Sequence, residues 1–393
     1  MIPHPFGSRT RDEIKALAAQ CAGDITRLLH EVSQKTETDV KTAAVETDPR
    51  ARQIVVGDDQ ESFDQLCRER RWSDGLPLVP PTPERVARLL TGTRRDPQKV
   101  IALLAPAYGA ATVEKIAINA AMTGCNAAQM PLLIAAVEAL ADPEFNLQGI
   151  QATTNSATPL VIVSGPLAQE LGFNSGINCL GQGVWMNATL GRAIHLMLQN
   201  IGGALPGEMD QATQGQPGKF TFCCAENQAG NPWEALHVER GMGAGDSAIT
   251  VVGASGTLNM NTHAKDADDL LRVIADTMIH PTSNDYWFGG EPWIVMGPEH
   301  AAVLKEARLD KPMVQRRLWE LSRMPGARFA QKDFDRTRHT RLAELGDTGG
   351  DSLFPISPDP GHIGIVVAGG PGTHSVYVPT FGNTRAVTRR ITG

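Results

Sequence analysis

Apolar segments of strand length that run directly into a glycine turn recur along this chain, and they constrain its fold more than any other feature. The clearest are Leu160–Pro166, Trp293–Pro298 and Ile363–Gly370, and Ile249–Gly253 is a looser fourth copy. Fully apolar strands that alternate with helices are typical of sheets covered on both faces. We therefore expect an α/β fold with mostly parallel or mixed sheets flanked by helices. The repetition has two explanations, an internal duplication of strand–glycine–helix units or the pattern common to all α/β folds.

At 393 residues the chain is too long for one ordinary hydrophobic core. A polar, weakly patterned stretch and then a proline-rich segment separate its amphipathic start from an apolar body. The expected parts are an N-terminal helix and polar linker (1–60), a proline-rich extended arm with short helices (61–98), and an α/β catalytic body (99–393), as one lobe or as two at about 99–260 and 261–393.

The N-terminal helix is predicted over residues 11–34 because apolar side chains repeat there at helical spacing. These side chains are Ile14, Leu17, Ile25, Leu28 and Leu29. An apolar stripe of this kind needs a cover. We expect it to pack either on another subunit of a homo-oligomer or back on its own chain.

Composition argues against several classes of partner. With 5% aromatic residues, a net charge of −7 and no long basic run, the chain lacks the basic stripe of a nucleic-acid-binding face. No apolar run approaches the ~20 residues of a membrane span, and residues 1–10 lack signal-peptide features. The six cysteines show no CxxC pair of the kind found in structural zinc sites. We expect a cytoplasmic protein that binds a small molecule, and neither nucleic acid nor membrane; no cofactor is predicted, although a metal is allowed.

Cys125 is the first candidate for catalysis. It follows the helix-ending Gly124 and precedes a helix predicted from about Asn126 to Leu140. The amides at a helix N-terminus stabilise an anion and lower the pKa of a thiol placed there, which would suit a nucleophile. Packing is the alternative, since free cysteine is among the most buried residue types.

Neutral polar residues cluster in two segments. One is a turn between two strands predicted within residues 148–163, and the other is a glycine-spaced loop, 174–183, that leads into a predicted helix. Amides exposed by glycine, together with amide side chains, can hold an oxyanion or carboxylate; a surface loop rich in Asx turns is the alternative. The residues assigned to substrate binding here are Thr154, Asn155, Asn178, Asn187 and Arg192.

Lys219 and Glu226 flank a strand predicted near residues 219–224. Lys219 would neutralise a bound carboxylate or phosphate, and Glu226 would act as an acid or base. Cys223 and Cys224 on this strand should point to opposite faces, so they cannot both serve one site and are expected to pack.

The sharpest local feature is the sequence Gly-Gly-Pro-Gly-Thr-His-Ser at residues 369–375, which follows an apolar strand. It places Gly370 and Ser375 in a predicted substrate site and His374 just beyond a glycine turn. An imidazole there can serve as a general base or a metal ligand. His300 is a weaker analogue. Because no two histidines have the spacing of a helical metal site, a metal would need ligands from distant segments.

Several of these segments resemble a bacterial protein group associated with the UGSC-type (seleno)protein family. The resembling stretches span roughly residues 70–393 and comprise Trp72–Pro83, Glu114–Ala120, Thr123–Cys125, Gly297–His300 and the Gly-Gly-x-Gly-x-His-Ser tail. The resemblance implies thiol redox chemistry, because the family's name motif pairs a cysteine or selenocysteine with a second cysteine. This chain has no Cys-Gly-Ser-Cys sequence.

Three functions are consistent with these residues. We expect first an enzyme that acts on a small polar or anionic molecule by cleavage or addition, as a lyase or hydrolase, without a redox cofactor. Cys125 would be its nucleophile or acid–base group, Lys219 would supply charge and His374 would relay a proton. The alternatives are a metal-dependent enzyme with ligands from His300, His374, Cys125 and Cys179, and a non-catalytic subunit or thiol-redox partner protein.

Overall fold

The chain divides into two compact units, Met1–Pro49 and Arg50–Gly393. The computed structural model describes residues 10–33, 51–346, 349 and 351–392. No helix within these ranges is long and apolar enough to cross a membrane.

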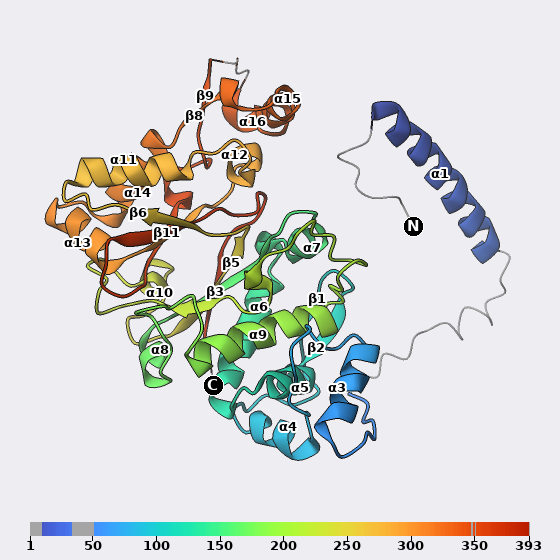
Figure 1. The fold of residues 1–393 in the computed structure, drawn as a ribbon. Helices are drawn as coiled ribbons and strands as arrows, with labels where there is room; N and C mark the ends of the chain where they lie inside the picture. Colours follow the sequence, from blue (N-terminus) through green and yellow to red (C-terminus); the bar gives the residue numbers. More distant parts are fainter. Residues whose placement is uncertain (1–9, 34–50, 347–348, 350, 393) are drawn as a thin grey trace. The chain divides into compact units, whose positions relative to one another are not determined.

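The first unit contains the predicted N-terminal helix, which is confirmed as α1 (Arg11–Ser33; Figure 1). On its apolar face, Ile14 and Ile25 are exposed. The side chains of Leu28 and Leu29 lie outside the described residues. A second subunit that covers this face therefore stays a prediction.

Local signals in the sequence account for where several helices of the second unit begin and end. Pro83 is the first residue of α4, and the Thr82 side chain accepts a hydrogen bond from the amide of Arg85. Gly124 ends α5 with a positive φ of 84°, as a left-handed cap does. The helices of this unit are α3 (Gln60–Glu69), α4 (Pro83–Leu90), α5 (Val113–Thr123), α6 (Met130–Leu140), α7 (Leu147–Ala152), α8 (Pro166–Glu170), α9 (Trp185–Asn200), α10 (Leu236–Glu239), α11 (Ala267–Met278), α12 (Asn284–Phe288), α13 (Pro298–Glu306), α14 (Lys311–Leu321), α15 (Gln331–Thr340) and α16 (Leu342–Leu345).

The main strands form two four-stranded sheets. In spatial order the first sheet is β12 (Val387–Arg390), β5 (Ala248–Ala254), β3 (Thr158–Ser164) and β4 (Cys223–Ala225). The second is β10 (Gly364–Val367), β7 (Trp293–Met296), β11 (His374–Val378) and β6 (Leu258–Asn261). Two short antiparallel pairs accompany them, β1 (Val100–Leu104) with β2 (Gly109–Thr112) and β8 (Met324–Pro325) with β9 (Leu353–Phe354).

The two sheets share one topology and exchange their last strands. In the first sheet β3 is parallel to β4 and antiparallel to β5; in the second β7 is parallel to β10 and antiparallel to β11. The next strand after β5 is β6, which pairs with β11, and the next after β11 is β12, which pairs with β5. The predicted α/β fold with mixed sheets is confirmed, and its repeated strand–glycine–helix units, β3 with α8 and β7 with α13, occupy equivalent places.

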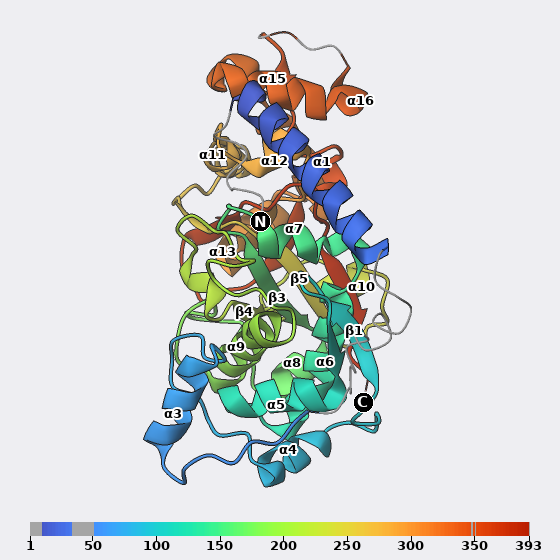
Figure 2. The same ribbon diagram turned by 90° about the vertical axis from the view of Figure 1, so that its right-hand side faces the viewer.

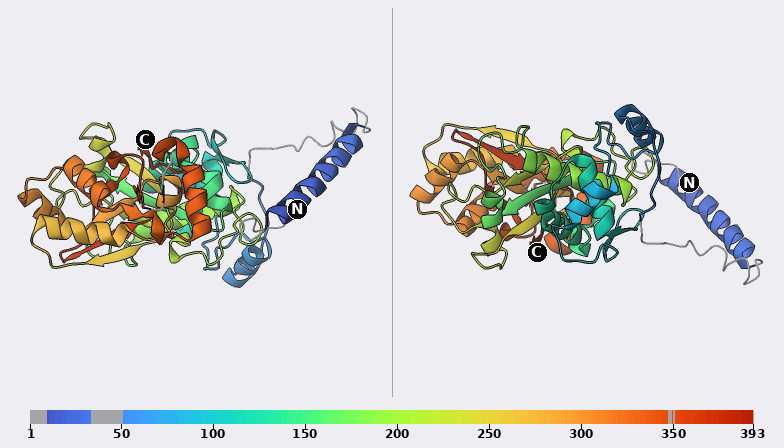
Figure 3. Two further views of the ribbon diagram at one scale, coloured as in Figure 1. Left: turned by 90° about the horizontal axis from the view of Figure 1, so that it is seen from above. Right: turned by 90° about the horizontal axis from the view of Figure 1, so that it is seen from below.

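Alternate side chains along the strands build a structure of four layers. Val161 and Val163 of β3 pack against α5, α6 and α9, while Leu160 and Ile162 face the second sheet. The second sheet does the same: Ile294 of β7 packs against α11, α13 and α14, and its neighbours Trp293 and Val295 face the first sheet. Each sheet therefore has helices on one face and the other sheet on the opposite face. Figures 1 and 2 label the two helical groups, and in Figure 3 the green first half and the orange-to-red second half of this unit adjoin.

One strand prediction was wrong, and another was wrong only in where the strand begins. The first strand expected within residues 148–163 is the helix α7, whose N-cap Asn146 accepts a hydrogen bond from the amide of Gly149. The strand expected near residues 219–224 begins only at Cys223, because Pro217–Lys219 forms a 3₁₀ turn. Cys223 and Cys224 point to opposite faces of β4, as predicted.

Candidate functional site

The carboxyl ends of three strands meet at one edge of the sheets. β7 and β10 are parallel neighbours; β7 leads through Gly297 into α13, and β10 leads through the turn 369–372 into β11. The segment after β4 joins them, because the Asn227 amide donates to the carbonyl of Val367 at 2.7 Å. Strand ends from both sheets therefore surround one place, where α/β proteins commonly hold ligands.

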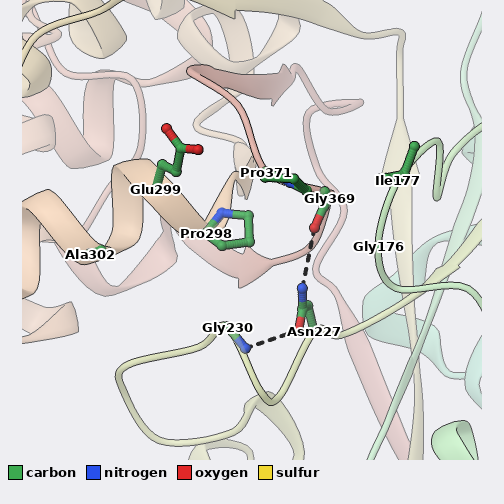
Figure 4. Close-up of a pocket in the computed structure, with 10 residues that line it drawn as sticks. Gly176, Ile177, Asn227, Gly230, Pro298, Glu299, Ala302, Gly369 and Pro371 are labelled. Atoms are coloured by element: carbon green, nitrogen blue, oxygen red, sulfur yellow. Dashed lines mark hydrogen bonds between the residues drawn. The ribbon is translucent and has the colours of Figure 1, made fainter.

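Two adjoining cavities open at this edge. The first, of about 550 Å³, lies against α13 and is called the α13 cavity; the second, of about 410 Å³, lies against β11 and is called the β11 cavity. They share the wall formed by Ile177, Gly369, Gly370 and Pro371. Figure 4 shows this arrangement around the α13 cavity, with Pro298 and Glu299 on one side of the turn and Ile177 on the other.

The shared wall depends on glycine. A Cβ atom at Gly370 would lie 2.3 Å from Cγ1 of Ile177, so any larger residue would push the loop 174–183 away from the turn. Two hydrogen bonds hold the turn in place: the Gly369 amide donates to Ser175 O at 2.9 Å, and Asn227 Nδ2 donates to Gly369 O at 3.2 Å (Figure 4). The predicted substrate residue Gly370 thus lies in both cavities.

His374 lines the β11 cavity, and Asn259 of the neighbouring strand β6 orients its ring. The His374 Nδ1 atom lies 3.2 Å from Asn259 Oδ1. Since an amide oxygen only accepts hydrogen bonds, Nδ1 must donate, which leaves Nε2 as the basic nitrogen. Asn178, whose Nδ2 donates to Gln182 O at 2.8 Å, lines the same cavity.

Ser375 forms a buried triad behind the cavity with His300 and Gly297. His300 Nε2 lies 3.1 Å from the carbonyl of Thr262, so Nε2 donates and Nδ1 accepts. Ser375 Oγ is 2.8 Å from that Nδ1 and accepts from the Gly297 amide at 3.0 Å. Burial lowers the pKa of His300, consistent with a neutral ring in this network. Ser375 was predicted to bind substrate; in the structure its hydroxyl joins the start of β11 to the start of α13.

Glu299 is the carboxylate of the α13 cavity. It lies in the first turn of α13, and its Oε1 accepts a hydrogen bond from the Gly372 amide at 2.9 Å. Among the described residues that line the two cavities there is neither lysine nor arginine; the ionisable side chains are Glu299, His374 and Cys179. Burial raises the pKa of the Cys179 thiol, which keeps it protonated.

Cys125 lies away from these cavities, beside the helices of the first sheet. Its Sγ is 3.4 Å from the carbonyl of Thr189 and packs against the apolar core. Burial raises its pKa to about 11, the opposite of the lowered pKa that we expected. The physical reason is that Asn126 caps a three-residue 3₁₀ turn, Ala127–Gln129, rather than α6 itself, so the thiol has burial without a strong helix dipole.

The two basic residues assigned to the site are both paired with carboxylates elsewhere. Lys219 Nζ is 2.5 Å from Asp210 Oδ2, and the Arg192 guanidinium makes a bidentate contact with Asp74 at 2.7 and 2.9 Å. Neither lines the two cavities, so neither supplies the charge that an anionic substrate there would need.

Glu226 and Asn187 are buried and hold loops together. Burial raises the pKa of Glu226, whose carboxylate accepts from the Leu236 amide at 2.9 Å and from Asn231 Nδ2 at 2.9 Å. Asn187 accepts from the amide of Asn174 and donates to its carbonyl, which closes the base of the loop 174–183.

Thr154 and Asn155 lie in the loop before β3 rather than between two strands. The Thr154 carbonyl accepts from the amide of Thr213 at 3.0 Å, and the Asn155 amide donates to Thr153 Oγ1 at 3.0 Å. These contacts order the loop and do not reach either cavity lining. Of the eleven predicted residues, the structure therefore brings together Asn178, Gly370, His374 and Ser375.

No three His, Cys, Asp or Glu side chains gather as a metal-binding group within the described ranges. His300, His374 and Cys179 lie near the same edge of the sheets. The Nδ1 atoms of both histidines already make hydrogen bonds, that of His300 with Ser375 and that of His374 with Asn259. No specific geometry in the described residues favours the metal-dependent alternative.

Sequence reasoning missed Glu299 and Asn259. Glu299 directly follows Gly297–Pro298, and the strand–glycine–helix signal there was enough to mark it. Asn259 has no comparable signal, because it reaches His374 only through the exchange of β6 into the second sheet.

The sequence matches no known protein-family model, and no curated protein is significantly similar to it.

Proposed function

We propose that this protein is an enzyme that acts on a small polar molecule by cleavage or addition, in the manner of a lyase or hydrolase, with His374 as its general acid–base group. The observation that carries the proposal is the 3.2 Å contact between Nδ1 of His374 and Oδ1 of Asn259, two exposed side chains on neighbouring strands, which favours one tautomer of the ring beside a cavity. A positioned imidazole of this kind typically contributes about 10²–10⁴-fold to a rate.

The proposal differs from the expectation based on sequence in the acid–base group and in the substrate. His374 is the acid–base group, and Cys125 has no catalytic role, because burial raises the pKa of Cys125 to about 11 and the thiol lies outside the cavities. The substrate is polar rather than anionic, because Lys219 and Arg192 are paired elsewhere. The resemblance to the UGSC-type family supports a thiol-redox role only through its name motif, which this chain lacks.

Turnover of small molecules by the full chain tests the proposal. The protein is incubated with a panel of hydroxy acids, amides, esters and amino compounds, and consumption is followed by mass spectrometry. We expect His374→Gln to lower turnover by about 10²-fold or more, whereas His339→Gln, at an exposed position of α15, should leave it unchanged. Turnover by His374→Gln within twofold of the unmodified protein, or consumption of no compound in the panel, would contradict the proposal.

A further inference from the structure

We infer that the α13 cavity recognises an amine: the ligand carries an ammonium group bound by Glu299, with a short apolar segment behind it. This inference rests on the proposed function, since the amine would be the part of the substrate that is held while His374 acts on the other part.

Charge is the first feature that distinguishes the α13 cavity. Glu299 is the one acidic side chain among the described residues that line the α13 cavity, and neither lysine nor arginine lines it. One of its oxygens, Oε1, is held by the Gly372 amide at 2.9 Å. That hydrogen bond fixes the carboxylate while leaving acceptor capacity on both oxygens for a ligand. A carboxylate attracts an ammonium group and repels an anion.

The remaining wall of the α13 cavity is largely apolar. Pro298 and Ala302 lie on the same side of the turn as Glu299, Pro371 belongs to the turn, and Ile177 lies across it (Figure 4). Ile177 is 72% exposed and lines both cavities, so its apolar side chain is accessible to a ligand. Contact with a short alkyl segment would cover it, and apolar surroundings strengthen the attraction between carboxylate and ammonium.

The two cavities adjoin at the turn 369–372. Gly369, Gly370 and Pro371 of this turn line both of them, together with Ile177. In the proposed complex, the part of the ligand beyond its ammonium group extends past this turn toward His374. This places recognition in the α13 cavity and proton transfer in the β11 cavity.

Binding of three four-carbon probes to the full chain tests the inference. 1-Butylammonium, 1-butanol and butyrate have similar length and differ in charge, and their dissociation constants are measured by ligand-observed NMR at low salt. We expect butylammonium to bind at least tenfold more tightly than the other two. Added salt should weaken its binding, because the attraction is between charges near the surface.

Glu299→Gln is the decisive variant, because glutamine keeps an Oε1 acceptor for the Gly372 amide and loses only the charge. It should bind butylammonium at least tenfold more weakly and no better than butanol. Glu306→Gln, at an exposed position of the same helix, is the matched control and should keep the preference. Ala302→Leu tests the cavity without touching the Gly372 contact, and it should weaken butylammonium binding by a similar factor.

The outcomes separate this inference from the proposed function. Butyrate or butanol binding as tightly as butylammonium, or a preference that survives in Glu299→Gln, would overturn amine recognition and leave the role of His374 intact. His374→Gln should keep amine binding while losing turnover. If it keeps both, the acid–base role fails and the amine site stands.

Discussion

His374 Nδ1 lies 3.2 Å from Asn259 Oδ1, across the boundary between β11 and β6. The two residues belong to neighbouring strands that lie far apart in the sequence, and the exchange of β6 into the second sheet brings them together. The candidate site therefore depends on the way the two halves of the chain are interleaved, and not only on the glycine turn beside it.

The first prediction concerns the tautomer of His374. In the unmodified protein the neutral ring should carry its proton on Nδ1, because Asn259 Oδ1 accepts from it. Asn259→Leu removes this acceptor, so the proton should move largely to Nε2 and turnover should fall about tenfold or more. The ¹⁵N chemical shifts of the ring nitrogens report the tautomer without need of a substrate. Gln65→Leu, at an exposed position of α3, is the control. An unchanged tautomer in Asn259→Leu would remove the orienting role.

The second prediction concerns the reactivity of Cys125. Because burial raises its pKa to about 11, only ~0.1% of this thiol would be thiolate at pH 8. We expect iodoacetamide to alkylate it much more slowly than Cys21, which is partly exposed on α1. Mass spectrometry of digested protein resolves the two sites. Rapid alkylation of Cys125, with a midpoint below pH 8.5, would restore it as a catalytic candidate.

The apolar strands could be predicted from sequence because their signal is local. β3, β7 and β10 are runs of buried residues with a glycine shortly after each run. Because both faces of these strands are buried, their sequences are continuously apolar and can be identified as strands. β6 and β12 could not be predicted in this way. Their sequences, Leu-Asn-Met-Asn and Val-Thr-Arg-Arg, contain exposed polar residues, and each strand is defined by a partner in the other half of the chain.

The residues of the candidate site likewise fall into those that a local sequence signal identifies and those that only the fold places. His374 and Gly370 were found because they adjoin a strand and a glycine turn, which sequence reveals directly. Lys219 and Arg192 were misplaced because a basic residue near a polar segment can face either a ligand or a carboxylate of its own chain, and only the fold shows that both pair with aspartates. The prediction of a lowered pKa for Cys125 was wrong for a different reason. The effect of burial on this pKa cannot be inferred from the position of Cys125 after Gly124.

The third prediction tests the strand exchange. Val387 of β12 is buried in the core of the first sheet, and Thr388 Oγ1 contacts Thr250 Oγ1 of β5 at 2.9 Å. Val387→Ala should lower the free energy of unfolding by roughly 1–3 kcal/mol, as the loss of buried methyl groups does. Hydrogen exchange should show the largest loss of protection in β5, although β12 follows β11 in the chain. The reciprocal variant Met260→Ala on β6 should instead expose β11.

A larger loss of protection in β11 than in β5, relative to the unmodified protein, would contradict this pairing when it is seen in Val387→Ala. The comparison of the two variants is needed because either one alone lowers the stability of the whole unit. Opposite patterns of protection are expected if each variant opens the sheet that its own strand completes.

The fourth prediction concerns Asp285, a fully buried carboxyl group that ties α12 to β11 and to the segment after it. It accepts hydrogen bonds from the Tyr377 hydroxyl at 3.0 Å and from the amide and hydroxyl of Thr380 at 3.1 and 2.5 Å. Burial outweighs these contacts and raises its pKa from 3.8 to about 6. Between these values the folded protein binds the proton more tightly than the unfolded chain does. The contribution of Asp285 to stability is therefore fully present below pH 3.8 and is lost as the pH rises through about 6.

A shift of this size corresponds to at most about 3 kcal/mol. Asp285→Asn keeps the shape of the side chain and removes its titration. We expect the difference in unfolding free energy between this variant and the unmodified protein, from urea denaturation at several pH values, to change by up to that amount between pH 4 and pH 7, in favour of the variant as the pH rises. Asp276→Asn, at an exposed position of α11, is the control for the loss of one carboxyl group. A difference for Asp285→Asn that stays constant with pH would mean that the hydrogen bonds from Tyr377 and Thr380 compensate fully for the burial of its charge.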